Sequence, residues 1–197
     1  NELPRPTFRW LRVNHTVSSL AGEDTAVQSI AVEANKDILS PLPVGTALLD
    51  GNYEGANKEA VHVLVEKAEG YAINVPPKAK EVVGIRIDAN ARVANRFQFI
   101  VGEGAELEVQ FYVTGSGDAL TNVSYLNEYD VKEAGKVVVK KVNLLPEHVQ
   151  HIEHRYTKLE EKADVEYINI EIGGSENILN YYHDLVGQES RMVHDIA

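Results

Sequence analysis

The sequence predicts a mainly β fold in which coils of strands stack on one another, a β-solenoid. A short motif recurs in which an apolar residue is followed four positions later by a small one and then by alternating apolar residues, as in the run from Val101 to Val109. The small residues of its copies are Ala79, Ala105, Gly135, Ala163 and Ser190, which lie 26, 30, 28 and 27 positions apart. A unit of this kind cannot bury its apolar face alone, so we expect neighbouring units to stack.

The length of the repeat supports the same fold. At about 3.3 Å per residue, a unit of ~28 residues has a path of roughly 90 Å, which is enough for two or three strands of about 5 residues and their corners. That is one full coil of a solenoid. A leucine-rich repeat of similar length would need the pattern L-x-x-L-x-L-x-x-N, which the sequence lacks.

Residues 1–70 are predicted to form a lead-in that precedes the solenoid. Four of the seven prolines lie within residues 1–55, and this indicates an extended segment with few regular elements. An apolar cluster around Phe8 and Trp10 follows two of these prolines. We expect both aromatic side chains to be buried against the repeat array, because exposed they would form an adhesive patch.

Residues 57–69, at the end of the lead-in, carry the pattern of one helix. Asn57 can cap its N-terminus, and Gly70 supplies a stop. Apolar residues recur at the i, i+3 and i+4 spacing of a single helix face, and they are Ala60, Val61, Leu64, Val65 and Ala68. This face is expected to pack on the rest of the protein.

Residues 71–197 are predicted to form the solenoid core, because the apolar period changes to two from Tyr71 onward. After Tyr167 the apolar set moves by one position to Ile168, Ile170 and Ile172. Such a slip would turn every following side chain to the other face, so a bulge or corner is expected there. We also expect the core to be incomplete at its C-terminus, since Ala197 falls in the middle of a repeat.

The composition excludes several classes of function. There are 19 basic and 30 acidic side chains, a net charge of −11, which repels phosphate backbones and anionic lipid. The nearest basic cluster, Lys136 with Lys140 and Lys141, has only three charges. Neither nucleic acid nor a membrane is therefore expected as a partner. The absence of cysteine excludes disulfides and thiolate chemistry in this chain and agrees with a cytoplasmic protein.

Motifs for catalysis and cofactor binding are missing. The sequence has no G-x-x-x-x-G-K-[S/T] phosphate loop, no G-x-G-x-x-G that opens a helix and no G-x-S-x-G elbow. The candidate for a metal is the tract with His148, His151 and His154. On a strand His151 points away from the other two, so we expect packing rather than metal binding. We assign no catalytic, cofactor-binding or metal residue.

Three segments carry a resemblance to a known family. The run of residues 4–14, beginning Pro-Arg-Pro-Thr-Phe-Arg-Trp, resembles the N-terminal signature of the shorter SufD-type proteins. Residues 100–109 are similar to the motif that opens the SufB/SufD core, and residues 154–174, ending in Gly-Gly, resemble a later coil of that core. The resemblance implies a right-handed parallel β-helix and membership of the cytoplasmic machinery that builds iron–sulfur clusters with the SufC ATPase.

The resemblance leads to one function and leaves two alternatives. It implies a non-catalytic subunit that docks a SufC-type ATPase and, through the β-helix, either a SufB-type scaffold or a second copy of itself. The iron–sulfur cluster would then be the product of the complex, with no cofactor in this chain. The absence of cysteine favours a SufD-like partner over a SufB-like scaffold. The alternatives are a calcium-dependent polysaccharide lyase built on a β-solenoid and a structural protein without a partner.

Overall fold

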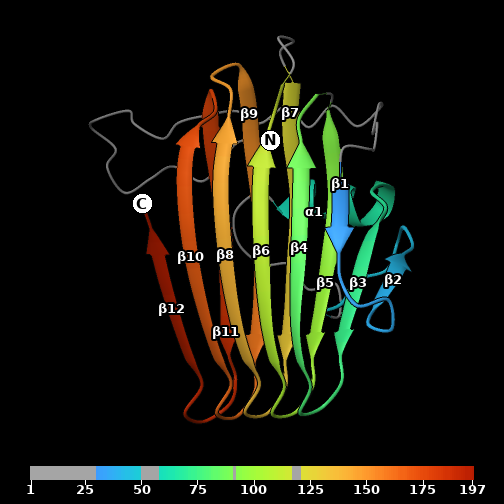
Figure 1. Cartoon of the computed structure of the whole chain (residues 1–197), viewed down its shortest axis with the longest axis vertical. Helices are drawn as coiled ribbons and strands as arrows, with labels where there is room; N and C mark the ends of the chain where they lie inside the picture. Colours follow the sequence, from blue (N-terminus) through green and yellow to red (C-terminus); the bar gives the residue numbers. More distant parts are fainter. Residues whose placement is uncertain (1–29, 50–57, 91, 117–120) are drawn as a thin grey trace.

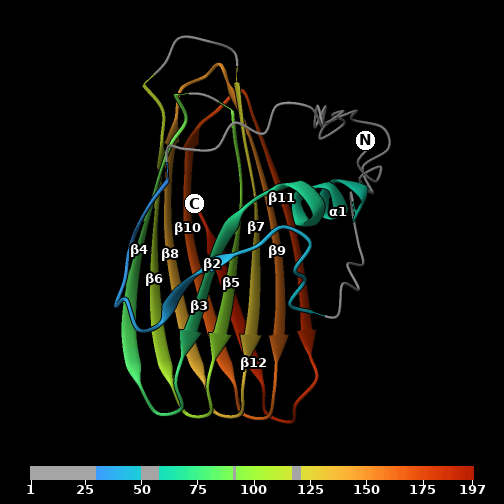
Figure 2. The same cartoon turned by 90° about the vertical axis from the view of Figure 1, so that its right-hand side faces the viewer.

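The computed structural model describes residues 30–49, 58–90, 92–116 and 121–197. Most of these residues belong to two six-stranded sheets that face each other (Figure 1, Figure 2). In the order of pairing, the first sheet consists of β1 (Ile30–Glu33), β4 (Lys80–Asp88), β6 (Glu106–Thr114), β8 (Lys136–Leu145), β10 (Asp164–Gly173) and β12 (Arg191–Ile196). The second sheet consists of β11 (Glu176–Leu185), β9 (Val149–Leu159), β7 (Thr121–Val131), β5 (Val93–Val101), β3 (Gly70–Val75) and β2 (Leu39–Leu42).

The chain alternates between the two sheets, and each coil contributes one strand to each. Strands β3 to β12 pair in parallel with the strand two places along the chain, whereas β1 and β2 pair antiparallel at the N-terminal edges. In Figure 1 the front strands from β4 to β12 run upward, the back strands from β3 to β11 run downward, and each new coil lies further to the left. This is a right-handed parallel β-helix, so the predicted fold is confirmed.

The strands are longer than predicted. Each strand from β4 to β11 has 9 to 11 residues, about twice the expected length, and each complete coil contains two of them. The reason lies at the corners between the two sheets. The corner between β5 and β6 occupies only residues 102–105, so nearly all of the repeat is available for strands.

The small residue of each repeat lies at an equivalent corner, as the motif predicted. Its backbone N–H donates to the carbonyl three residues earlier, as Ala105 does to Gly102 at 3.0 Å. The preceding residue has a positive φ at all five corners, and these residues are Lys78, Gly104, Ala134, Lys162 and Glu189. The left-handed conformation is costly for side chains other than glycine. Hydrogen bonds between successive corners offset this cost, as from the Ala134 N–H to the Glu161 carbonyl at 2.8 Å.

The predicted slip after Tyr167 is wrong. Strand β10 keeps an unbroken register with β8 from Asp164 to Gly173. Ile170 and Ile172 point outward and are 38% and 58% exposed, while Asn169 lies inside. The apolar pattern shifts because the interior beside the end of β10 is polar, not because the strand bends.

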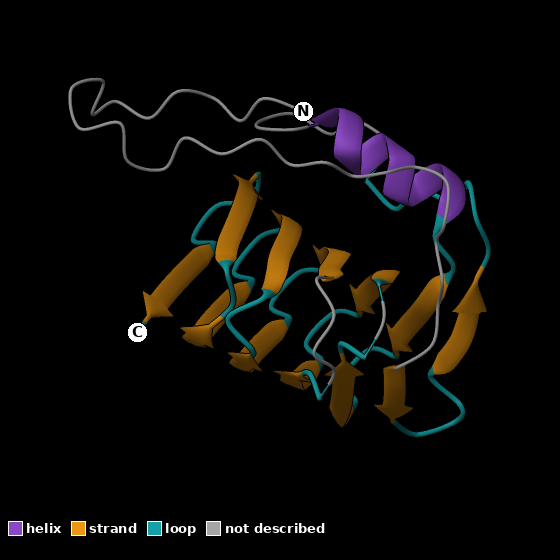
Figure 3. Cartoon of the chain, turned by 90° about the horizontal axis from the view of Figure 1, so that it is seen from above, coloured by secondary structure: helices purple, strands orange, loops and turns teal. Residues whose placement is uncertain are grey.

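The predicted helix is confirmed as α1 (Lys58–Lys67), which lies against the outer face of the second sheet (Figure 3). All five residues of its predicted apolar face are buried. Four of them, Val61, Leu64, Val65 and Ala68, pack on Ala94, Leu126 and Tyr156 of the sheet. The fully buried Arg96 of β5 fixes this arrangement, because its guanidinium donates to the carbonyls of Ala68 at 3.0 Å and Pro43 at 2.7 Å.

Gly70 begins β3 and ends the connection from the helix. A Cβ atom at this position would lie 2.1 Å from the carbonyl oxygen of Arg96. A side chain there would separate β3 from β5, so only glycine fits. Phe8 and Trp10 lie outside the described residues, and their burial stays a prediction.

Candidate functional site

The interior of the β-helix changes from apolar to charged along its axis. One row of register partners in the first sheet runs from Ile85 to Phe111, Lys141 and Asn169. A row in the second sheet runs from Phe97 through Asn127 to Arg155 and Tyr181. In the early coils these positions belong to the main apolar core. In the later coils they form a buried polar network, which is the candidate functional site.

Lys141 is the cation at the centre of this network. Its Nζ donates to Glu153 Oε2 across the interior at 2.5 Å and forms a second ion pair with Glu171. The side chains of Lys141 and Glu153 are completely buried, and that of Glu171 is 8% exposed. A buried lysine is stable as a cation only when carboxylates compensate its charge. Strands β8, β9 and β10 therefore supply one connected group of charges.

Arg155 is the second cation, and it lies between two aromatic rings. Its guanidinium carbon is 4.1 Å from the ring centroid of Tyr167 and 4.2 Å from that of Tyr181. Its Nη2 donates to Glu153 Oε1 at 2.6 Å, and the Tyr181 hydroxyl donates to Glu153 Oε2 at 3.1 Å. The planar guanidinium is suited to such stacking. Cation–π contacts and a direct ion pair thus hold the same side chain.

Glu153 remains ionised within the network. Burial by itself would raise the pKa of this carboxyl, but the neighbouring charges of Arg155 and Lys141 outweigh burial and hold the pKa well below its usual range. Two cations and two carboxylates, Glu153 and Glu171, balance one another. The network can therefore hold charge inside the protein without needing an additional ion.

His151 extends the network toward the ends of the strands. Its Nε2 lies 3.0 Å from the Tyr125 hydroxyl, and its Nδ1 lies 3.1 Å from both Asn143 Nδ2 and Asn177 Oδ1. Burial, helped by the charge of Lys141, lowers the pKa of His151 to about 3. The ring is neutral at physiological pH and acts as a hydrogen-bonding member of the network.

The structure separates the three residues of the histidine tract. His151 points into the interior, whereas His154 is buried on the opposite face of β9, where its Nδ1 lies 3.2 Å from Asn180 Nδ2. Burial lowers the pKa of His154 to about 4. His148 precedes β9 in a turn. The prediction that His151 and His154 diverge is thus confirmed. Within the described ranges, no group of three or more His, Asp or Glu side chains could hold a metal ion.

Two further histidines line the last coil, and sequence analysis missed them. His183 on β11 and His194 on β12 lie 5.4 Å and 5.5 Å from the Tyr167 ring, measured between ring centroids. Asn169 Nδ2 lies 2.9 Å from His194 Nε2. Burial is the main cause that lowers the pKa of His183 to about 4. Counting strand positions from Ser190 could have found His194, because it shares the inward parity of Met192. The same count would have missed His183, because Leu185 and not the motif residue Val186 is the register partner of the inward Leu159.

The basic cluster noted in the sequence also divides between two surfaces. Lys140 points outward and pairs with Glu108 at 2.9 Å, whereas the adjacent Lys141 points into the interior. Alternation along a strand places neighbouring residues on opposite faces. The cluster therefore does not form a basic patch.

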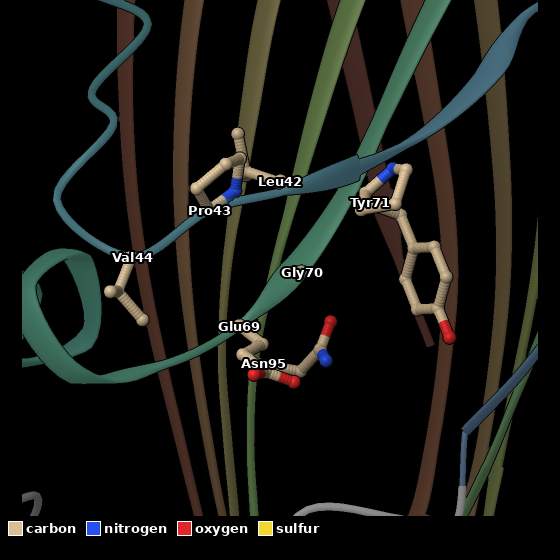
Figure 4. Close-up of a pocket in the computed structure, with 8 residues that line it drawn as sticks. Leu42, Pro43, Val44, Glu69, Gly70, Tyr71 and Asn95 are labelled. Atoms are coloured by element: carbon tan, nitrogen blue, oxygen red, sulfur yellow. The ribbon is translucent and has the colours of Figure 1, made fainter.

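A pocket at the other end of the solenoid has different chemistry. It lies between β2 and the start of β3, and Figure 4 shows its lining. Its residues are Pro41, Leu42, Pro43, Val44, Glu69, Gly70, Tyr71 and Asn95. The lining is mostly apolar and contains one carboxylate and no basic residue. It lacks the paired acid and base groups that would suggest catalysis.

These features define a class of protein: a parallel β-helix whose last coils enclose a charge-balanced polar network. The family model described as "SUF system FeS cluster assembly, SufBD core domain" matches residues 85–196, more than half of the chain. The chain belongs to the SufB/SufD family of the iron–sulfur cluster assembly system, as its sequence resemblance predicted. No curated protein and no solved structure gives a significant match. No helix in the described part of the chain has the length and apolar character needed to cross a membrane.

Proposed function

We propose that this protein is a non-catalytic subunit of the Suf complex that docks a SufC-type ATPase and a SufB-type scaffold. The observation that carries the proposal is the family match, which covers the β-helix from β4 to β12. The cluster is the cargo of the assembled complex. This chain has no cysteine to ligate it, and we propose that it holds no cofactor of its own.

The β-helix is the part of the chain that is suited to docking. At the N-terminal end, β1 and β2 cover the edges of β4 and β3 by antiparallel pairing. The stacked coils present long outer faces formed by the two six-stranded sheets, and solenoid proteins bind partners through such extended surfaces. We propose that a SufB-type chain, or a second copy of this one, docks on the β-helix in the cytoplasm.

The polysaccharide lyase alternative has less support. A calcium-dependent enzyme would need carboxylates that converge on one exposed site. Outward carboxylates on β6 pair instead with lysines of neighbouring strands, as Glu106 does with Lys80 at 2.8 Å and Glu108 with Lys140 at 2.9 Å. The buried carboxylates Glu153 and Glu171 both pair with Lys141.

Co-expression tests the proposed function. The complete protein should co-purify with its cognate SufC-type ATPase and SufB-type scaffold and elute with them as one complex in size-exclusion chromatography with light scattering. An authentic SufD serves as the positive control. Separate elution under conditions where the control assembles would contradict the docking role.

A separate measurement tests the proposal that this chain neither hydrolyses ATP nor holds an iron–sulfur cluster. The 197-residue chain should hydrolyse ATP no faster than buffer and should show no iron–sulfur absorbance after anaerobic reconstitution and desalting. A SufB-type scaffold treated in parallel is the control. A retained chromophore would show that the chain binds a cluster without cysteine.

A further inference from the structure

The outer face of the first sheet carries an exposed apolar patch. The patch lies on β6, β8 and β10 and consists of four exposed residues, Tyr112, Leu144, Ile170 and Ile172, with the half-buried Val142 and Ile168. Tyr112, Val142 and Ile170 are register partners in one row, and Leu144 and Ile172 are partners in the next. Their side chains are therefore neighbours across three adjacent strands. Tyr112 is 42% exposed, Leu144 41% and Ile172 58%. A contiguous apolar surface of this kind marks an interaction site.

The second sheet shows what covers an apolar outer face in this fold. There the amphipathic helix α1 lies across the strands, and Val61, Leu64 and Val65 pack on Leu126 and its neighbours. The first sheet has no counterpart to α1 among the described residues, and Figure 1 looks directly onto its strands. Both faces are built from long parallel strands, and on the second sheet the apolar side chains beneath the helix are Ala94, Leu126 and Tyr156. A helix is therefore the element that fits the patch.

The charge at the border of the patch indicates what kind of helix fits. A shallow groove beside the patch is lined by Glu33, Gly84, Arg86, Tyr112 and Lys140, among others. Lys140 already pairs with Glu108. The Arg86 guanidinium lies 5.9 Å from the Tyr112 ring centroid and forms no ion pair with any described residue. Arg86 is the register partner of Tyr112. It therefore places a cation at the end of the row formed by Tyr112, Val142 and Ile170.

These observations disfavour a second copy of this chain and a membrane as occupants. The six patch residues include no carboxylate, and Glu33, the carboxylate that lines the groove, lies on the edge strand β1, on the side of Arg86 away from the patch. Each copy would also bring a net charge of −11, and the same charge opposes binding to anionic lipid.

We propose that this patch docks an amphipathic helix of a partner protein, with apolar side chains on the patch and one Asp or Glu side chain against Arg86. The apolar contacts exclude water, and the carboxylate sets the direction and register of the helix. The proposal goes beyond assembly with the SufC-type ATPase and the SufB-type scaffold, which co-purification tests separately.

A fluorescent helical peptide tests the patch directly. The probe has about four turns, Leu at the i, i+3, i+4 and i+7 positions of one face and a single Glu beside that face. Its anisotropy is followed during titration with the complete protein. Ile172→Lys should weaken binding about tenfold, and Leu144→Gln provides a second variant. Val82→Lys is the matched control, because Val82 is also 58% exposed on the same sheet face but lies outside the patch.

A charge exchange tests the role of Arg86. Arg86→Glu should weaken binding of the Glu peptide about tenfold and should restore binding of a matched peptide with Arg in place of Glu. Arg191→Glu, on the same face at its opposite end, should change neither. Circular dichroism confirms that each variant is folded.

Several results would overturn the proposal. These are failure of the Glu peptide to bind the wild-type protein, equal losses for Ile172→Lys and Val82→Lys, and no rescue by the exchanged charges. Self-association that Ile172→Lys abolishes would assign the patch to a second copy. Binding to vesicles of phosphatidylcholine and phosphatidylserine that Ile172→Lys abolishes would assign it to a membrane.

Discussion

The early coils of the β-helix are filled with aromatic and aliphatic side chains, whereas the later coils enclose charges. In the early coils Phe97, Phe99 and Phe111 contact one another at ring-centroid distances of 5.6 to 6.5 Å. In the later coils Lys141 and Arg155 occupy positions in the same rows. The backbone coil is the same at both ends. The difference shows that this fold specifies its corners and strands independently of what fills the interior.

The largest expected effect comes from breaking the charge balance. Glu153→Ala should destabilise the protein by roughly 3–5 kcal/mol, because Arg155 would remain buried without its carboxylate. Urea unfolding followed by circular dichroism measures the change. The double variant Glu153→Leu with Arg155→Leu leaves the pair of Lys141 and Glu171 intact, so it should lose less than Glu153→Ala alone. Equal or greater loss in the double variant would show that packing, not charge, decides stability here.

The buried histidines of β9 should make the free energy of unfolding depend on pH. Their folded pKa values, about 3 for His151 and about 4 for His154, lie below the ordinary value of 6.5. As pH falls below 6.5 the unfolded chain binds protons that the folded chain does not, so stability is complete above pH 6.5 and declines toward pH 4. Each histidine should contribute about 1.4 kcal/mol per pH unit.

Urea unfolding at pH 7, 6 and 5 tests this slope. His154→Gln should flatten it, while His62→Gln on the exposed side of α1 should leave it unchanged. An unchanged slope in His154→Gln would mean that this ring is accessible to protons in the folded protein.

Substitutions at the corners should destabilise the early and the later coils by similar amounts, although the interiors of these coils differ. Ala105 and Ala163 are completely buried at equivalent corners, one in the early coils and one in the later coils. Ala105→Leu and Ala163→Leu should each cost roughly 1–3 kcal/mol by overpacking. Glu133→Leu, at an exposed corner position, is the control. Wild-type thermal stability in both alanine variants would refute the equivalence of the corners.

We expect the smallest change in stability at Lys140, which is exposed and precedes the buried Lys141. Lys140→Ala removes an ion pair between side chains that are 49% and 31% exposed, and it should cost less than about 1 kcal/mol. Lys141→Ala, one residue further on, leaves the buried Glu171 without its cation and removes one of the two cations that pair with Glu153, so it should cost several times more. Comparable chemical denaturation midpoints for the two variants would contradict the division between outer and inner faces.

The sequence determined the repeat and much that depends on it. The spacing of the small residues predicted stacked coils, and Ala105, Gly135 and Ala163 do lie at equivalent corners. The helix over residues 57–69 followed from its apolar face and from Gly70. These features are local, because corner geometry and helix periodicity depend on residues close together in the chain. The family resemblance was likewise carried by contiguous segments.

Only the tertiary structure decided the content of the interior. Lys141 of β8 and Glu153 of β9 form an ion pair across the two sheets. The sequence of either strand alone does not indicate this contact. The polar inner residues Asn169 and Glu171 made the alternation after Tyr167 look like a slip, although the strand is continuous. Whether an inward position holds an apolar or a charged side chain depends on what faces it from the other sheet and from the neighbouring coils. Those partners lie 12 or more residues away in the chain, so the residue pattern within one strand cannot predict them.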